Sequence, residues 1–375
     1  MQISDNSFRV AMPFGTRRQA LQFLAIILIA LSLPVFNEHI LSRRPADVYR
    51  TVPPEYLNYK FIGDEISQGG LADIVIIGSS DAWTSFDVKS ISATLSKKLG
   101  RSVRVLNFGT NWSGAETNYQ RVKDLLTNLK VKVLILTEGN WAPGDDYPHR
   151  LAKFLLAIPD VQTASLITPR QATMLYGSVV LGAPHRTWSV IRDVATRPML
   201  PLWEAKAEQM RLSSGFLGER QGWKPNRSPD SVEPMPYLDL DLAVPTYPTE
   251  DFFYKGHPDD LFALQGPYDE YQTAFLKLID QSVRRQGGVF AVVAPPIFFH
   301  DAAVEKVNLH SLARDESRSW PTVGISMTRL FPGRTFDDMK QFYSNESHLG
   351  DSGARLFGKA IVPALSALLA KASGD

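Results

Sequence analysis

The sequence contains no cysteine, which excludes disulfide bonds and thiolate metal sites. Its formal net charge is only +1, so there is no basic excess of the kind that binds nucleic acid, and we expect no nucleic-acid partner. The glycine-rich signatures of dinucleotide and nucleoside-triphosphate sites are missing as well. The acidic pairs Asp145-Asp146 and Asp259-Asp260 have no histidine or third carboxylate at ligand spacing. We therefore expect neither a cofactor nor a metal ion.

One long apolar run lies near the N-terminus. Residues 20–36 (ALQFLAIILIALSLPVF) carry no charge, and their 17 residues reach the short end of a membrane span. The run predicts an uncleaved single-pass membrane anchor, with the rest of the chain outside the cytoplasm. A cleaved signal peptide is the second interpretation, and the positive-inside signal is weak because arginines lie on both sides of the run. A buried soluble helix is disfavoured because the segment is not amphipathic.

A short tail precedes this anchor, and a stalk and a domain are expected to follow it. Residues 1–19 form a tail, and residues 37–71 are polar and proline-bearing, which suggests a stalk. A single catalytic domain is predicted from residue 72 to residue 375, interrupted by a long insertion at about 141–268. The insertion is a natural place for a lid or a ligand surface, although a purely structural excursion is equally compatible with its sequence.

Strands and helices alternate on both sides of the insertion. A β-branched run from Asp73 to Ile77 predicts a strand buried on both faces, and it ends in the small residues Gly78-Ser79-Ser80. Asp87 then caps a predicted helix. Further strands are predicted at 103–109, 131–137 and 289–294, with helices between them, one of which is capped by Asp269. This alternation predicts an α/β fold with a doubly wound, flavodoxin-like parallel sheet.

Weaker patterns complete the prediction. In the insertion, helices are expected around Arg150–Ile158 and Gln171–Val180. Near the C-terminus we expect a short strand around Gly324–Leu330 and a loop over Gln341–Leu349. A terminal helix over Gly350–Lys371 is predicted to be kinked by Pro363.

Four candidate site residues follow predicted strands or precede the last helix. Because parallel strands deliver their C-terminal loops to one edge of a sheet, Ser80, Gly109, Asn140 and His348 should converge there. Ser80 is then a candidate nucleophile with His348 as its base, and oxyanion donors would come from the Ser80 and Gly109 N–H groups and the Asn140 amide. The plainer interpretation is a strand-to-helix turn at Ser80 and a structural loop histidine.

These motifs resemble those of the SGNH (GDSL-like) hydrolase superfamily over residues 72–140 and 269–371. Gly78-Ser79-Ser80 resembles the G-D-S block with serine in the Asp position, and Gly109 and Asn140 resemble the glycine and asparagine of the next two blocks. The segment Asn345–His348 resembles the final D-x-x-H block, with Asn345 in the Asp position. The resemblance implies an SGNH-type sheet and a serine esterase or acyltransferase.

The anchor, the G-S-S block and the large insertion together resemble the SGNH-like proteins that accompany membrane-bound O-acyltransferases in bacterial polysaccharide O-acetylation. By this resemblance, Ser80 would accept an acetyl group from such a partner and pass it to a sugar hydroxyl of a polysaccharide outside the cytoplasm. A catalytically inactive module that binds polysaccharide or scaffolds an export complex is the alternative.

Asn345 keeps that alternative open, because a neutral amide can orient imidazole but cannot stabilise imidazolium by charge. The site could instead be a Ser–His dyad helped by a backbone carbonyl, or it could use the carboxylate of Glu346 or Asp337.

Overall fold

A computed structural model describes residues 16–39, 48–49, 52, 58–110, 113–137, 148–149, 151–156, 165–196, 242–253, 268–298, 320–345 and 348–374. At the centre of the fold is a five-stranded parallel sheet in the order β2-β1-β3-β4-β5. Its strands are β1 (Gly70–Gly78), β2 (Val105–Gly109), β3 (Leu129–Thr137), β4 (Val289–Ala294) and β5 (Thr322–Gly324). The predicted α/β class with a parallel sheet is confirmed, and the strand order is that of flavodoxin-like sheets.

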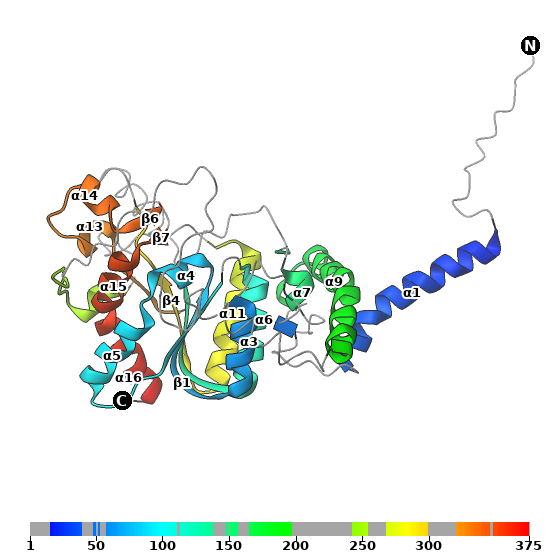
Figure 1. Ribbon diagram of the computed structural model, residues 1–375, viewed down its shortest axis with the longest axis horizontal. Coiled ribbons are helices and arrows are strands. Elements are labelled where there is room, and N and C mark those ends of the chain that lie inside the picture. Colours follow the sequence, from blue (N-terminus) through cyan, green and yellow to red (C-terminus); the bar gives the residue numbers. More distant parts are fainter. Residues whose placement is uncertain are drawn as a thin grey trace, which may run out of the picture.

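Helices cover both faces of the sheet (Figure 1). In β1, Val75 and Ile77 belong to the core on one face, whereas Ile74 and Ile76 belong to the core on the other. Side chains of a strand alternate between faces, so an unbroken apolar run requires cover on both. The covering helices are α3 (Asn58–Gln68), α6 (Ala115–Asn128) and α11 (Glu270–Arg285) on the first face, and α5 (Val88–Leu99) and α16 (Val362–Ser373) on the second.

The winding of the chain marks one edge of this sheet. From β1 the chain passes to β2 on one side, and it then returns to β3 on the other side of β1. In doubly wound sheets, ligands bind outside the carboxyl ends of the strands at such a reversal. A short helix, α4 (Ser80–Ser85), begins there immediately after β1. The sequence predicted a turn at this point but not the helix.

The predicted helix caps are present. The Asp87 carboxylate accepts the Ser90 N–H at 3.1 Å, and α5 ends at Gly100, whose φ of +65° suits glycine. The Asp269 carboxylate likewise accepts the Gln272 N–H at 2.8 Å and starts α11. Local polar residues therefore set these boundaries as the sequence indicated.

The predicted stalk is wrong over its second half. Residues 58–68 form α3, and Tyr59, Ile62 and Ile66 of this helix are fully buried in the core that covers the sheet. The spacing of these three residues puts them on one face of a helix. The segment is polar on average because polar residues surround them, so its composition alone did not indicate a packed helix. Val48, Tyr49 and Val52 belong to the same core, so the described residues between positions 48 and 72 are part of the domain.

The C-terminal part departs from prediction at two points and agrees with it at a third. β5 stops at Gly324, and residues 327–330 form the short helix α13 (Met327–Leu330) because Ser326 caps it. The predicted loop at 341–349 contains an antiparallel hairpin, β6 (Tyr343–Asn345) and β7 (His348–Leu349). The terminal helix is broken into α15 (Asp351–Ala360) and α16, which meet at 48° beside Pro363, so the predicted bend is confirmed.

The described parts of the insertion pack beside α6. α7 (Ala152–Leu155) is shorter than predicted, and α9 (Pro169–Thr196) is much longer, whereas η3 (Thr249–Phe252) lies near α16. Leu155, Leu175 and Val179 join the core on the α6 side. Most of residues 197–267 lie outside the described residues.

The N-terminal helix α1 (Arg17–His39) stands away from the sheet (Figure 1). From Arg17 to Phe36 it is long and apolar enough to cross a membrane, and its large apolar side chains are exposed. This helix includes the predicted anchor at 20–36.

Candidate active site

Ser80 and His348 meet at the carboxyl edge of the sheet. Ser80 is the first residue of α4 and His348 the first of β7, and the Ser80 Oγ lies 2.7 Å from the His348 Nε2 although 268 positions separate them. Ser80 is partly buried, and the His348 side chain is 17% exposed. An imidazole nitrogen at this distance can take the hydroxyl proton, which is the arrangement that activates a serine.

A glycine at the end of β1 makes the turn that presents Ser80. Gly78 has φ +149°, a conformation that other residues rarely adopt, and a Cβ there would collide with the Thr137 hydroxyl. Ser79 follows in an extended conformation and caps α4, where its carbonyl accepts the Ala82 N–H at 3.1 Å. The chain therefore leaves the strand sharply, and Ser80 stands at the helix start.

A second glycine lets α4 sit on the end of β2. Gly109 lies beside Gly78 in the sheet register, and a Cβ on Gly109 would come within 2.5 Å of the Trp83 backbone nitrogen. The predicted oxyanion donor, the Gly109 N–H, donates to the Asn107 Oδ1 at 2.8 Å. An oxyanion role for Gly109 stays a prediction, and it would require this bond to be exchanged.

Asn107 links α4 to β2 through its side chain. Its Nδ2 donates to the Ala82 carbonyl at 2.9 Å, while its Oδ1 accepts the Gly109 N–H. Asn107 is thus a positioning residue for the first turn of α4, where Ser80 lies. The sequence analysis gave it no role, because the partner carbonyl is 25 positions away along the chain.

A buried arginine, Arg121, also stabilises the carboxyl edge of the sheet. Arg121 of α6 is 1% exposed, and its guanidinium donates to the Phe108 carbonyl at 2.8 Å and to the Gly78 carbonyl at 3.2 Å. Burial lowers the pKa of Arg121, while the nearby phenols of Tyr59 and Tyr49 raise it. These bonds fix the carbonyl ends of β1 and β2. The sequence analysis missed Arg121, whose only signal was a charge next to the apolar face of α6.

Asp81 is a buried carboxylate beside the serine–histidine pair. Its Oδ1 lies 3.4 Å from the His348 Nε2, and its side chain is 6% exposed. Burial raises the pKa of Asp81 to about 7, and the Ser79 hydroxyl, 3.4 Å from the Oδ2, opposes this rise. Asp81 therefore approaches the same ring nitrogen as Ser80. The sequence analysis assigned it no role, although it directly follows Ser80.

The third group that would orient His348 stays a prediction. Asn345 pairs with His348 through the backbone of the hairpin, but its side chain lies outside the described structure. Glu346 and the predicted oxyanion residue Asn140 also lie outside the described residues. The alternative carboxylate Asp337 is exposed in the first turn of α14 (Phe336–Lys340).

We compared the chain with protein-family models, curated proteins and solved structures, and none of the three comparisons gave a match. The functional argument therefore depends on the geometry of the site and on the sequence motifs.

Proposed function

We propose that this chain is a membrane-anchored, serine-dependent acyltransferase or esterase of SGNH type that acts on a polysaccharide outside the cytoplasm. The contact of 2.7 Å between the Ser80 Oγ and the His348 Nε2 is the observation that carries the proposal. A serine in the turn after the first strand, with a base from the segment before the terminal helix, is the order that the sequence motifs predicted.

The proposed reaction has two steps that use the same pair. The Ser80 Oγ attacks the carbonyl carbon of an acyl ester while its proton passes to the His348 Nε2, and His348 then gives this proton to the departing alcohol. The product is an ester on Ser80. In the second step a sugar hydroxyl or water gives its proton to His348 and attacks the acyl carbon. The Ser80 Oγ leaves and recovers the proton from His348.

Asp81 has a distinct part in this proposal. When His348 carries the serine proton it is a cation, and an ionised Asp81 carboxylate 3.4 Å away stabilises it. Because burial raises the pKa of Asp81 to about 7, the carboxylate is ionised only from neutral pH upward. Acyl transfer should therefore become faster as pH rises through about 7.

The nature of the substrate and the location rest on different support. The apolar helix α1 supports a single-pass membrane anchor, whereas the inner membrane and the periplasmic domain come from the sequence resemblance. The polysaccharide acceptor and a membrane-bound O-acyltransferase as acyl donor come from the sequence resemblance.

Covalent trapping with a fluorophosphonate tests the nucleophile directly. The purified full chain should gain the mass of one phosphonyl group, because the Ser80 Oγ displaces fluoride from phosphorus. Ser80→Ala should not be labelled, and His348→Ala should be labelled at least about a hundredfold more slowly. Ser79→Ala is the matched control from the same turn, and it should still be labelled at Ser80.

The same proteins should be assayed for hydrolysis of a small acetyl ester. Unchanged labelling of Ser80→Ala would contradict the assignment of the nucleophile. The wild-type chain could also be neither labelled nor active, even beside a membrane O-acyltransferase. That result would favour the alternative interpretation, an inactive polysaccharide-binding module, over an enzyme.

A further inference from the structure

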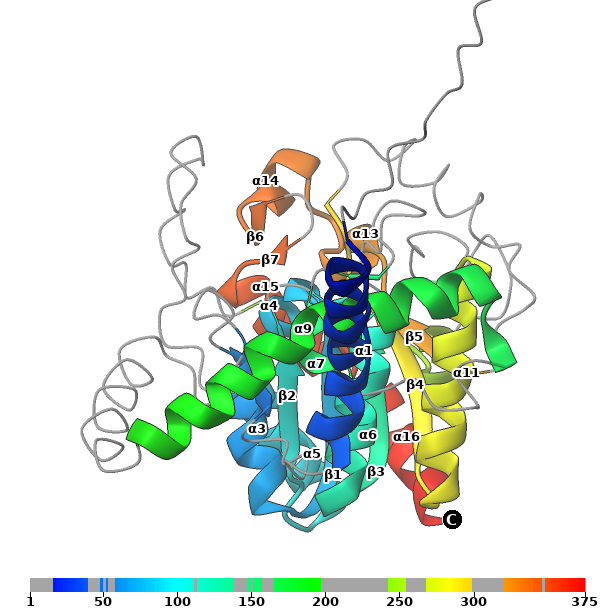
Figure 2. The ribbon, with the colours of Figure 1, turned by 90° about the vertical axis from the view of Figure 1, so that its right-hand side faces the viewer.

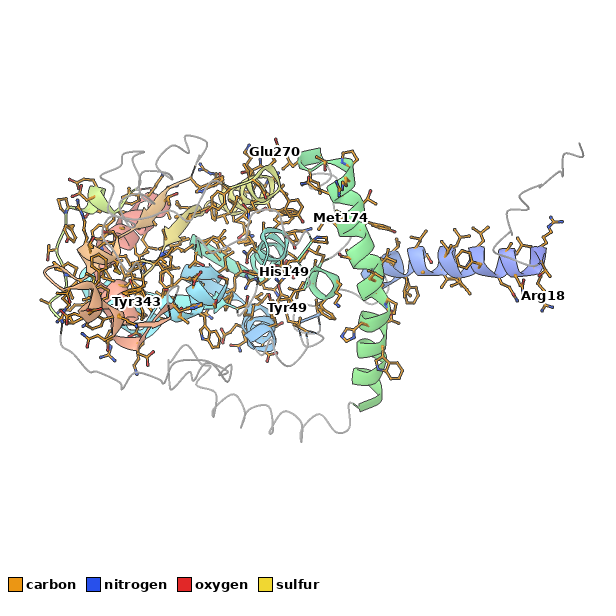
Figure 3. All side chains as sticks on the ribbon, turned by 90° about the horizontal axis from the view of Figure 1, so that it is seen from above. Arg18, Tyr49, His149, Met174, Glu270 and Tyr343 are labelled. Carbon is orange, nitrogen blue, oxygen red and sulfur yellow. The ribbon has the colours of Figure 1, made fainter. Side chains whose placement is uncertain are left out.

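Helix α9 crosses the end of the apolar helix α1. The two helices contact each other, and the Tyr176 hydroxyl of α9 donates to the Leu31 carbonyl of α1 at 3.0 Å. Viewed along α1, α9 runs across it (Figure 2), and from above it stands between α1 and the domain (Figure 3). Arg18 marks the far end of α1 in Figure 3. The axis of α9 therefore lies across the direction in which α1 would cross a membrane.

One side of α9 packs on the domain. Leu175, Val179 and Ala183 are buried, with spacings of four residues that put them on one face of the helix. Leu175 and Val179 belong to the core that also contains residues of α6 and α7. This face holds α9 against the folded domain.

The opposite side of α9 carries an exposed apolar stripe. Met174, Leu181 and Trp188 are 39%, 77% and 63% exposed, and each follows the previous one by seven residues, so they lie along one side with little angular drift. Arg170, four residues before Met174, is also exposed on this side. The exposed face of α5, at the far side of the molecule, instead carries Lys97 and Lys98.

We propose that the stripe Met174, Leu181 and Trp188 lies in the boundary between lipid headgroups and acyl chains of the membrane that α1 crosses. This inference rests on the anchoring role proposed for α1. α9 meets α1 at Leu31, and the apolar span ends at Phe36, which is about 7–8 Å further along the axis. That depth matches the 5–10 Å to which interfacial helices bury their apolar faces.

The chemistry of the stripe fits a lipid surface. Tryptophan concentrates at membrane interfaces because its ring is apolar and its N–H is polar, and Trp188 provides such a group. Arg170 can meet lipid phosphates beside the stripe. With α9 held in this boundary, α1 and α9 together fix the orientation of the domain, whereas a single helix would leave it free to turn about the anchor.

The absence of cysteine allows a direct test by single labels on the full chain. Leu181→Cys and Met174→Cys probe the stripe, Leu28→Cys probes the middle of α1, and Lys97→Cys is an exposed control on α5. Each protein is labelled with an environment-sensitive fluorophore and reconstituted into vesicles of phosphatidylethanolamine and phosphatidylglycerol. The vesicles contain lipids with a spin-label quencher either near the headgroup or deep in the acyl chain.

The stripe labels should be quenched at least about twofold more by the shallow quencher than by the deep one. The Leu28 label should be quenched more by the deep quencher, and the Lys97 label by neither. Thermal unfolding close to that of the unlabelled chain shows that the exposed substitutions leave the fold intact.

If the Leu28 label is quenched but one or both of the stripe labels are not, the inference is overturned and the anchor still stands. This includes the case in which a second copy of the chain covers the stripe. No lipid quenching at any position would remove the anchor, and with it the premise of the inference.

Discussion

Two buried carboxylates at opposite ends of β1 have contrasting surroundings. At the amino end, Asp73 accepts the Arg104 N–H at 2.9 Å and pairs with Arg101 and Lys132, each at 3.0 Å. Burial by itself would raise the pKa of Asp73, but these three partners lower it below its ordinary value. At the carboxyl end, no lysine or arginine of the described residues pairs with Asp81, and its pKa is raised to about 7 by burial.

The opposite pKa shifts of Asp73 and Asp81 distinguish a structural carboxylate from one in the candidate site. Asp73 is satisfied by fixed partners, so its charge stabilises the fold. Asp81 is buried beside Ser80 and His348, and its charge costs stability in the resting protein. Perturbed carboxylates of this second type concentrate at functional sites. The contrast predicts that the two ends of β1 respond oppositely to substitution.

The largest effect is expected at the carboxyl end. Ser80→Ala and His348→Ala should each lower kcat for a small acetyl ester by about 10⁴, because the two side chains act as a unit. The double variant should be little worse than either single variant. Steady-state kinetics checks this, and unfolding midpoints close to wild type would locate the effect in the chemistry. Additive losses in the double variant would contradict a shared role.

Asn345→Asp should have the next largest effect, and it should increase activity. If residue 345 orients His348, a carboxylate there stabilises the imidazolium formed during attack, and kcat should rise by up to about 10³. The measurement is the same ester kinetics at pH 8, with Asp337→Asn as a control that should change little. No gain in Asn345→Asp, with Ser80→Ala still inactive, would move the orienting role to Glu346, Asp337 or a backbone carbonyl.

At the amino end, Asp73→Ala should destabilise the fold without changing the chemistry. We expect a loss of about 2 kcal/mol in the free energy of unfolding at pH 7, since the partly exposed Arg101 and Lys132 are screened. Because the pKa of Asp73 is lowered in the fold, its contribution is lost as pH falls through the folded value, so the loss should shrink below pH 4. Urea titrations at several pH values measure it, and a kcat below wild type for folded protein would contradict a purely structural role.

Asp81→Asn should change stability with the opposite sign. The folded pKa is raised to about 7, so the unfolded chain loses the Asp81 proton first and stability falls between about pH 4 and 7. Removing the carboxylate should therefore stabilise the fold at pH 8, by at most the roughly 4 kcal/mol that a rise of about three in pKa represents, and by little at pH 4. The same variant should lower kcat about tenfold at pH 8. A loss of stability that is constant with pH would show that the Asp81 charge is compensated in the fold.

The sequence was sufficient for the framework of the fold. Apolar runs in the sequence indicate buried strands, and the loops after parallel strands lie at the same edge of the sheet. The proximity of Ser80 and His348 could therefore be predicted from the sequence. The caps Asp87 and Asp269 were equally readable because their partners are three residues away.

What the sequence did not reveal depends on contacts between distant segments. Asn107 reaches the carbonyl of Ala82, and Arg121 reaches the ends of two strands, and neither pairing leaves a local pattern. The hairpin that carries His348 has too few residues for a period to be recognised. The sequence shows Asp81 as the residue after Ser80, but its burial results from the packing of α4 on the sheet, which the sequence did not predict.

The paired glycines at the ends of β1 and β2 bear on which residues evolution would preserve in related proteins. Gly109 is required because α4 rests on its bare backbone, and Gly78 is required by its positive φ and by the adjacent Thr137 hydroxyl, so selection for folding alone would preserve both. Ser80 and His348 are under no such requirement, since neither is needed for that packing. In a lineage that lost the chemistry and kept the protein, both glycines would persist while the serine and the histidine drifted. Retention of all four residues in diverged descendants would therefore be a record of continued catalysis, whereas retention of the glycines alone would record only the fold.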